Sequence, residues 1–244
     1  MSLLEVFLIA LGTALATGLG AFPVLALGSM KSRSVALPSA LAAGCMLGAT
    51  IGLLYEGASS EPLRTLIGAI LGVGFIAASR AVLGKGREAH IGNLRGARGM
   101  TALLVIGVMT VHSSAEGVAL GVSGADEGSL GILIAVAIAI HNIPEGIAVS
   151  LTLIPHGETT RSAIGWSIFS SLPQPLMAVP AFLAVRSFEP LLPVGLGFAG
   201  GAMLWMVITQ LLPEAFKPPS RGPALATLIG SATAMVVIEF AIGF

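Results

Sequence analysis

The chain has 244 residues, of which 55% are hydrophobic and only 10% are charged, and its formal net charge is zero. Soluble globular domains carry roughly 25% charged residues, so this composition excludes an ordinary soluble domain and indicates a protein that crosses a membrane several times. A neutral chain offers no basic surface for nucleic acid, and its one cysteine, Cys45, excludes both an intrachain disulfide and a zinc site built from cysteines.

Eight segments of the chain are apolar and long enough to cross a bilayer, which takes about 20 residues in a helix. We expect these spans at residues 4–29, 35–55, 63–83, 101–123, 129–153, 162–186, 190–215 and 222–243. The first segment lacks the basic start of a cleaved signal peptide and is predicted to be retained. Short loops with glycine, proline and charged residues separate the spans. We therefore expect residues 1–244 to form a single all-α transmembrane domain.

The charges of the loops alternate between two sides of the membrane. Ten of the twelve basic residues lie in or beside the odd-numbered loops: Lys31, Arg33, Arg80, Lys85, Arg87, Arg95, Arg98, Arg161, Lys217 and Arg221. The even-numbered loops hold Arg64 and Arg186 with most of the acidic loop residues. Because basic loops stay in the cytoplasm, we expect the odd-numbered loops to be cytoplasmic and both termini to be extracytoplasmic.

A short internal sequence repeat relates the second span to the seventh. Ala-Gly-Cys-Met-Leu at 43–47 matches Gly-Gly-Ala-Met-Leu at 200–204, and each is followed by Leu-Leu-x-Glu. The two spans run in opposite directions in the predicted topology, as an inverted repeat requires. Chance recurrence in a chain rich in glycine, alanine and leucine is the alternative explanation.

Two matching pairs of ionisable residues lie in the middle of the fourth and fifth spans: His112 with Glu116, and His141 with Glu145. Residues four positions apart share one face of a helix, one turn apart. Ionisable groups at this depth in a bilayer are costly and mark ion or proton pathways. A structural hydrogen bond explains a single intramembrane histidine equally well, but two pairs at matched depth favour a metal site.

The antiparallel fourth and fifth spans can bring both pairs to one point near the middle of the membrane. Two imidazoles and two carboxylates suit Zn²⁺, and Fe²⁺ or Mn²⁺ also accept them. The ion would neutralise both carboxylates and so offset the cost of burying them. Pro144 removes a backbone donor beside Glu145, so we expect the fifth span to be kinked or locally unwound there.

Three further residues at this depth are candidate ligands. Asn142 offers an amide oxygen, either as a ligand or as an anchor for the ligands. Met46 in the second span is either a ligand or a gap filler in apolar packing. Gln174 in the sixth span lies between two prolines, so we expect its helix to be distorted there. Its side chain is either a ligand or an interhelical hydrogen-bond partner. The sequence assigns no role to Glu239, deep in the eighth span.

The doubled His-x-x-x-Glu-Gly pattern, His-Asn-Ile-Pro-Glu-Gly at 141–146 and Ala-Gly-Cys-Met at 43–46 resemble the ZIP (Zrt/Irt-like) divalent-metal transporters, in particular their bacterial GufA-like branch. The resemblance covers essentially the whole chain. It implies a 3+2+3 arrangement, in which the first and last three helices form an inverted repeat and the fourth and fifth hold the transport site. It also implies that Met46, His112, Glu116, His141 and Glu145 are the main ligands.

The resemblance further implies import of zinc, or of iron, manganese or cadmium, into the cytoplasm by elevator-like alternating access. The expected partners are the divalent ion and the lipid bilayer, and glycine-rich helix faces permit a homodimer. We expect a multi-pass protein of the cell (inner) membrane, with no cofactor besides the transported ion. Metal selectivity and proton coupling do not follow from the sequence.

The chain departs from the family pattern at three positions. Many bacterial members are expected to hold a second ion beside the first, with help from an amide on the fourth span and a glutamate on the sixth. Here Ser113 and Gln174 stand at these positions, and Gln210 replaces an acidic residue near the end of the seventh span. We therefore predict one tightly bound ion and a weak or absent second site.

Two rival functions use the same residues. An intramembrane metal-dependent enzyme would activate water on the ion, but the chain has neither a separate general base nor a His-Glu-x-x-His motif. A proton-translocating or purely structural membrane subunit would use the pairs without metal, and the purified protein would then contain none.

Overall fold

The computed structural model describes residues 1–22, 36–83, 96–126, 130–154, 157–218 and 221–242. Every regular element in these residues is helical. The helices are α1 (Leu3–Leu19), α3 (Ala36–Ser60), α4 (Pro62–Leu83), α5 (Gly96–Ala125), α6 (Leu130–Leu153), α7 (Thr160–Ser171), α8 (Pro173–Ser187), α9 (Leu191–Met206), the π-helical turn η3 (Val207–Leu211), α10 (Leu212–Ala215) and α11 (Arg221–Ile242). The prediction of an all-α chain is confirmed for this part of the protein.

Seven helical segments in the described part are long and apolar enough to cross a membrane. Two of these segments are composite, because α7 continues into α8 and α9 continues through η3 into α10. The shorter apolar helix α1 has 17 residues, the lower end of the length that spans a bilayer. The chain is therefore a multi-pass membrane protein.

Prolines interrupt two of the long segments. Pro173 and Pro175 follow Leu172, where α7 ends and α8 begins. Pro213 lies just after the π-helical turn and lacks the N–H that would continue the helical hydrogen bonds. Within this turn, the carbonyl oxygen of Thr209 accepts a hydrogen bond from Nη1 of Arg80 on α4 at 3.5 Å. A side chain of the neighbouring helix thus contacts the backbone where the helix is irregular.

Pro144 does not interrupt its helix. The structure shows α6 as a continuous α-helix from Leu130 to Leu153 with Pro144 inside it. Of the two expected outcomes, a kink or local unwinding, the unwinding is therefore wrong, and the kink stays a prediction. A proline removes one hydrogen bond, and the close packing of α1, α3 and α5 against α6 holds the helix together on both sides of it.

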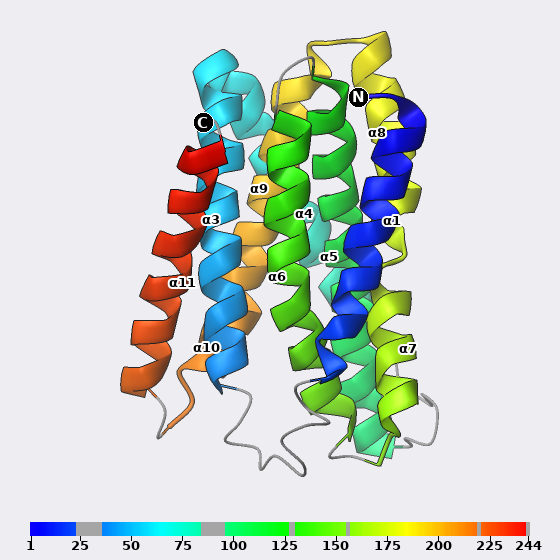
Figure 1. Ribbon diagram of the computed structural model, residues 1–244, viewed down its shortest axis with the longest axis vertical. Coiled ribbons are helices and arrows are strands. Elements are labelled where there is room, and N and C mark those ends of the chain that lie inside the picture. Colours follow the sequence, from blue (N-terminus) through cyan, green and yellow to red (C-terminus); the bar gives the residue numbers. More distant parts are fainter. Residues whose placement is uncertain (23–35, 84–95, 127–129, 155–156, 219–220, 243–244) are drawn as a thin grey trace.

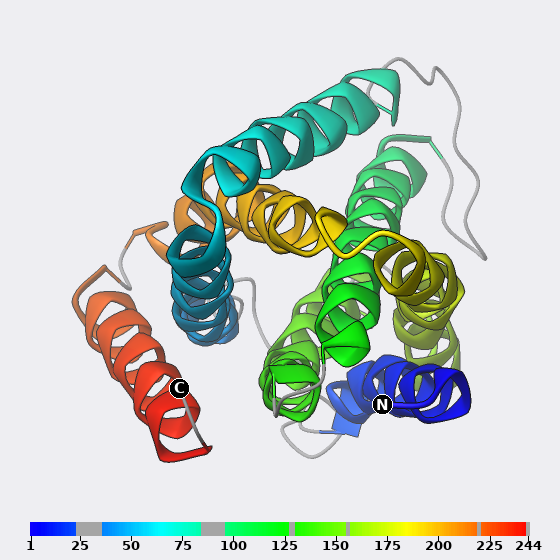
Figure 2. The ribbon, with the colours of Figure 1, turned by 90° about the horizontal axis from the view of Figure 1, so that it is seen from above.

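The helices form two groups that pack side by side (Figures 1 and 2). In one group, α5 and α6 pack against each other and against α7, and α1 packs on α6 and α8. In the other, α4 and α3 pack on α9, and α11 packs on α3. Contacts of α6 with α3 and of α5 with α9 join the groups. The candidate site lies on α5 and α6, at the centre of the first group.

Helix α1 approaches α6 so closely that backbone meets backbone. A Cβ added at Gly146 of α6 would overlap the carbonyl oxygen of Thr17, and one added at Gly20 would overlap the carbonyl oxygen of Ile143. Glycine is the residue that permits such an approach. This contact brings the polar side chains of α1 next to the ionisable residues of α6.

Helix α1 begins and α11 ends at the same end of the bundle (Figure 1). The segments 23–35 and 84–95, which contain five of the ten basic residues assigned to the cytoplasmic side, lie outside the described residues. The orientation of the chain in the membrane therefore stays a prediction.

Candidate metal centre

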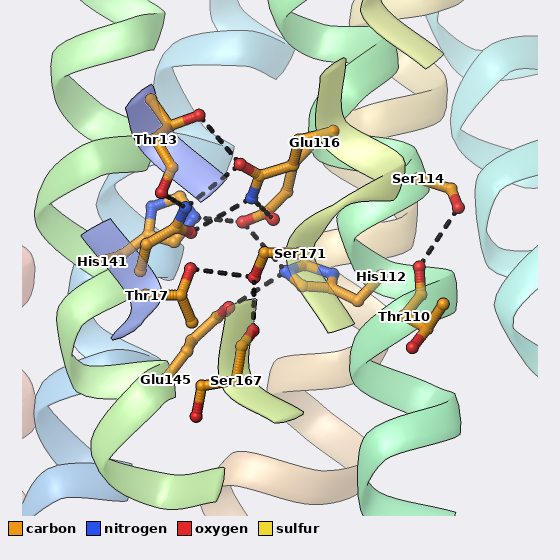
Figure 3. A network of polar contacts seen from close by, with 12 residues as sticks. Thr13, Thr17, Thr110, His112, Ser114, Glu116, His141, Glu145, Ser167 and Ser171 are labelled. Carbon is orange, nitrogen blue, oxygen red and sulfur yellow. Dashed lines mark hydrogen bonds and ion pairs between the residues drawn. The ribbon is translucent and has the colours of Figure 1, made fainter. Parts of the chain in front are cut away.

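The two predicted pairs are held by adjacent antiparallel helices. His112 and Glu116 lie one turn apart on α5, and His141 and Glu145 lie one turn apart on α6. All four side chains are at most 1% exposed. Because α5 and α6 pack along one another, the two faces that carry these pairs point toward each other (Figure 3).

One ligand atom from each of the four side chains lies within 4.8 Å of the other three. The Nε2 of His112 is 3.3 Å from a carboxylate oxygen of both Glu116 and Glu145. The Nε2 of His141 is 2.5 Å from the same oxygen of Glu116, Oε1. The structure thus brings the two pairs together as one cluster, with Glu116 at its centre.

Several polar atoms of this cluster have no hydrogen-bond partner in the described part of the chain. They are Nδ1 and Nε2 of His112, Nδ1 of His141 and Oε1 of Glu145. The Nε2 of His112 approaches both carboxylates without the geometry of a hydrogen bond. Buried polar groups are almost always paired, so this set of unpaired donors and acceptors indicates a group that binds from outside the chain.

A divalent cation fits the chemistry and the size of the cluster. Tetrahedral zinc binds nitrogen and oxygen at about 2.0–2.1 Å, which places its ligand atoms about 3.3 Å apart. Around the ion, ligand atoms that are up to 4.8 Å apart would need to approach by about 1.5 Å, and His141 Nε2 and Glu116 Oε1, which are 2.5 Å apart, would need to separate by about 0.8 Å. Two neutral imidazoles and two carboxylates together carry two negative charges, which a divalent cation cancels.

Asn142 and Gln174 join the cluster through their amide groups. The Nε2 of Gln174 donates to Glu116 Oε2 at 2.5 Å, and the Nδ2 of Asn142 donates to Gln174 Oε1 at 3.2 Å. Both side chains are fully buried. The structure therefore places both predicted residues at the site, and in it they hydrogen-bond to Glu116 and to each other.

Thr13 of α1 also takes part, and no sequence pattern marks it. Its carbonyl oxygen accepts a hydrogen bond from Asn142 Nδ2 at 2.7 Å, and its hydroxyl lies 2.8 Å from Gln174 Oε1. A single threonine in an apolar span has no spacing that marks it. Its partners lie 129 and 161 residues away along the chain.

Three other residues singled out in the sequence have different surroundings. Met46 of α3 is fully buried in the apolar core, where its predicted role as a ligand stays a prediction. Gln210 lies in the π-helical turn. Glu239 of α11 is 4% exposed and faces Gly52 of α3, and its Oε1 has no hydrogen-bond partner in the described residues.

Comparison with known proteins places these features among metal transporters. The sequence pattern of the family described as "ZIP Zinc transporter" matches residues 84–239. Over 233 residues the chain is 42% identical to an Arabidopsis thaliana protein whose name describes a putative zinc transporter. The matched region covers 93% of this chain but only 38% of that protein. It is 31% identical over 246 residues to the zinc transporter GufA of Myxococcus xanthus, with 93% of this chain and 95% of GufA covered. It is 38% identical over 119 residues to the zinc transporter ZIP11 of Homo sapiens, with 34% of this chain and 35% of ZIP11 covered.

Proposed function

The chain belongs to the ZIP zinc transporter family, and on this basis we propose that it moves a divalent transition metal, zinc in the first place, across the membrane into the cytoplasm. The observation that carries the proposal is the fully buried cluster of His112, Glu116, His141 and Glu145, whose ligand atoms converge between two apolar helices. The family match weighs against the metal-dependent enzyme, because the matched proteins are named as transporters.

In the proposed cycle, a hydrated ion arrives from the extracytoplasmic side and exchanges water for these four ligands. Two surface hollows at the ends of α3, α5 and α8 are compatible with this route, because each is lined by two acidic residues and one arginine: Glu61, Glu189 and Arg64 in one, and Asp126, Glu189 and Arg186 in the other. The ion leaves toward the side where the loops are basic. The orientation rests on the positive-inside rule.

The transport step is proposed to be alternating access, in which one group of helices moves against the other. The division into two groups supports it, since the metal cluster belongs to α5 and α6 alone. The 3+2+3 inverted repeat is supported by a reciprocal packing pattern. The third helix of each proposed triplet, α4 or α11, packs on the second helix of the other, α9 or α3.

We propose a single transmembrane domain over residues 1–244 with both termini outside, located in the cell (inner) membrane. A homodimer remains a prediction. The roles of Met46, Asn142 and Gln174 also remain predictions, each residue being either a ligand of the ion or a packing or hydrogen-bonding neighbour of the ligands. Zinc ranks first because the matched relatives carry zinc in their names. Iron, manganese and cadmium accept the same mixed nitrogen and oxygen ligands.

Zinc uptake into proteoliposomes tests the proposal. Replacing both His141 and Glu145 by alanine is expected to reduce uptake to the level of protein-free liposomes, because half of the ligands are lost. The matched control replaces Thr110 by valine and Ser114 by alanine on α5, where the hydroxyls bond only to their own helix backbone. The control should transport normally. Uptake by the His141 and Glu145 double variant equal to that of wild type would overturn the proposal.

Zinc affinity is expected to fall at least about tenfold between pH 7.5 and pH 5.5. Binding requires neutral histidines and ionised glutamates, so protons compete with the ion and are released when it binds. Isothermal titration calorimetry in two buffers of different ionisation enthalpy measures both the affinity and the number of protons released. An affinity that does not change with pH, without proton release, would contradict the assigned ligands.

A further inference from the structure

The hydrogen bonds around Gln174 fix which end of its amide faces the ion site. A carboxylate only accepts hydrogen bonds, so the group that lies 2.5 Å from Glu116 Oε2 is the amide nitrogen, Nε2. The second hydrogen of Nε2 points to Asn142 Oδ1 at 3.4 Å. The other end, Oε1, then accepts from Asn142 at 3.2 Å and faces the Thr13 hydroxyl at 2.8 Å.

Asn142 is fixed in the same way. Its Nδ2 has two hydrogens, of which one goes to the backbone oxygen of Thr13 at 2.7 Å and the other to Gln174 Oε1. Every donor of both amides is therefore used, and their oxygens are turned toward each other's donors. Three helices contribute to this arrangement: α1, α6 and α8.

The two oxygens of Glu116 consequently have different surroundings. Oε1 lies 2.5 Å from Nε2 of His141 and 3.3 Å from Nε2 of His112, on the side where the four ligands converge. Oε2 accepts the hydrogen bond of Gln174. Oε1 therefore faces the other three ligands, whereas Oε2 is engaged by the amide of Gln174.

We propose that Gln174, held by Asn142 and Thr13, is a positioning residue that restricts Glu116 to one metal-binding oxygen and the site to one ion. This inference rests on the proposed function, and it assigns Gln174 and Asn142 to the support of a ligand rather than to the ion itself. Hydrogen bonds to a ligating carboxylate orient it, and their loss typically costs about 10–100-fold in metal affinity.

Glutamate at position 174 would reverse this restriction. An oxygen would then stand where Nε2 stands, 2.5 Å from Glu116 Oε2. Two carboxylates so close together in a buried site require a proton or a cation between them. At pH 8 we expect a second divalent ion to bind there, coordinated by residues 116 and 174.

The test counts zinc bound to the purified full-length protein at pH 8, by elemental analysis and calorimetry. Wild type should bind one ion per chain and Gln174→Glu two. Gln174→Ala should still bind one ion, about 10–100-fold more weakly. Thr13→Val should weaken binding less, because Asn142 still donates to Gln174. The matched control is Thr110→Val, which removes a hydroxyl bonded to Ile106 of its own helix and should leave affinity and count unchanged.

Three results would overturn the inference: two ions bound to wild type, one ion bound to Gln174→Glu, or an unchanged affinity in Gln174→Ala. Structural damage does not mimic the expected result, because a damaged site does not gain an ion. Wild type that binds no zinc would instead refute the proposed function. The two failures are therefore distinguishable.

Discussion

Replacing Glu116 by glutamine is expected to lower zinc uptake by more than about 100-fold while the protein still folds. The substitution preserves the shape of the side chain but removes a charge that faces both histidines. The ion would then be buried at bilayer depth with one carboxylate instead of two. Loss of one partner from a buried charge pair costs about 3–5 kcal/mol, and about 1.4 kcal/mol corresponds to a factor of ten.

Uptake into proteoliposomes and zinc binding to the purified protein measure this effect. Glu5→Gln is the matched control, because this exposed side chain accepts a hydrogen bond from the Ser2 N–H at the start of its own helix, a capping role that glutamine also fills. The control should retain wild-type uptake. If Glu116→Gln retained most of its uptake, Glu116 would not be a ligand.

Replacing Gly146 by alanine is expected to destabilise the protein and to weaken zinc binding at the same time. The added Cβ overlaps the carbonyl oxygen of Thr17 and forces α1 away from α6. Thr13, one turn earlier on α1, then moves away from Asn142 and Gln174. Overpacking of this kind costs about 1–3 kcal/mol, so the thermal unfolding midpoint should fall.

Gly165→Ala provides the comparison for this substitution. Gly165 lies on α7 with open space where its Cβ would be, and alanine is favoured over glycine in a helix. Its unfolding midpoint should equal that of wild type or exceed it slightly. Equal midpoints and equal zinc affinities for Gly146→Ala and wild type would show that α1 does not support the site through this contact.

The helical class and the pairing of the ionisable residues could be predicted because both follow from local sequence patterns. A span is recognised from its own apolar residues, and a spacing of four places His112 with Glu116, and His141 with Glu145, on one helix face. That the two pairs meet follows from the antiparallel course of consecutive spans joined by a short loop.

The surroundings of the pairs could not be predicted, because they depend on contacts between distant segments. Thr13 meets Asn142 only because glycines let α1 approach α6. The sequence left Gln174 open between a ligand and a hydrogen-bond partner, since an amide both donates and accepts. In this structure the Nε2 of Gln174 donates to Glu116 Oε2, which supports the hydrogen-bonding role.

The course of the helices at the prolines was predicted in part. The prolines beside Gln174 indicated a distorted helix, and the chain does end α7 and begin α8 there. Pro144 indicated a kink or local unwinding, and the structure lacks the unwinding. The π-helical turn at 207–211 precedes Pro213 and contains no proline itself, so no residue within it marks its position.

The most direct test of the metal site is X-ray absorption spectroscopy of the zinc-loaded protein, purified without a histidine tag. The chain has four histidines, and replacing His90 and His156 by alanine leaves only His112 and His141. Zinc bound to this variant should show two imidazoles together with carboxylate oxygens at about 2.0–2.1 Å. A zinc shell without imidazole, or a variant that binds no zinc, would contradict the assignment of these side chains as the ligands.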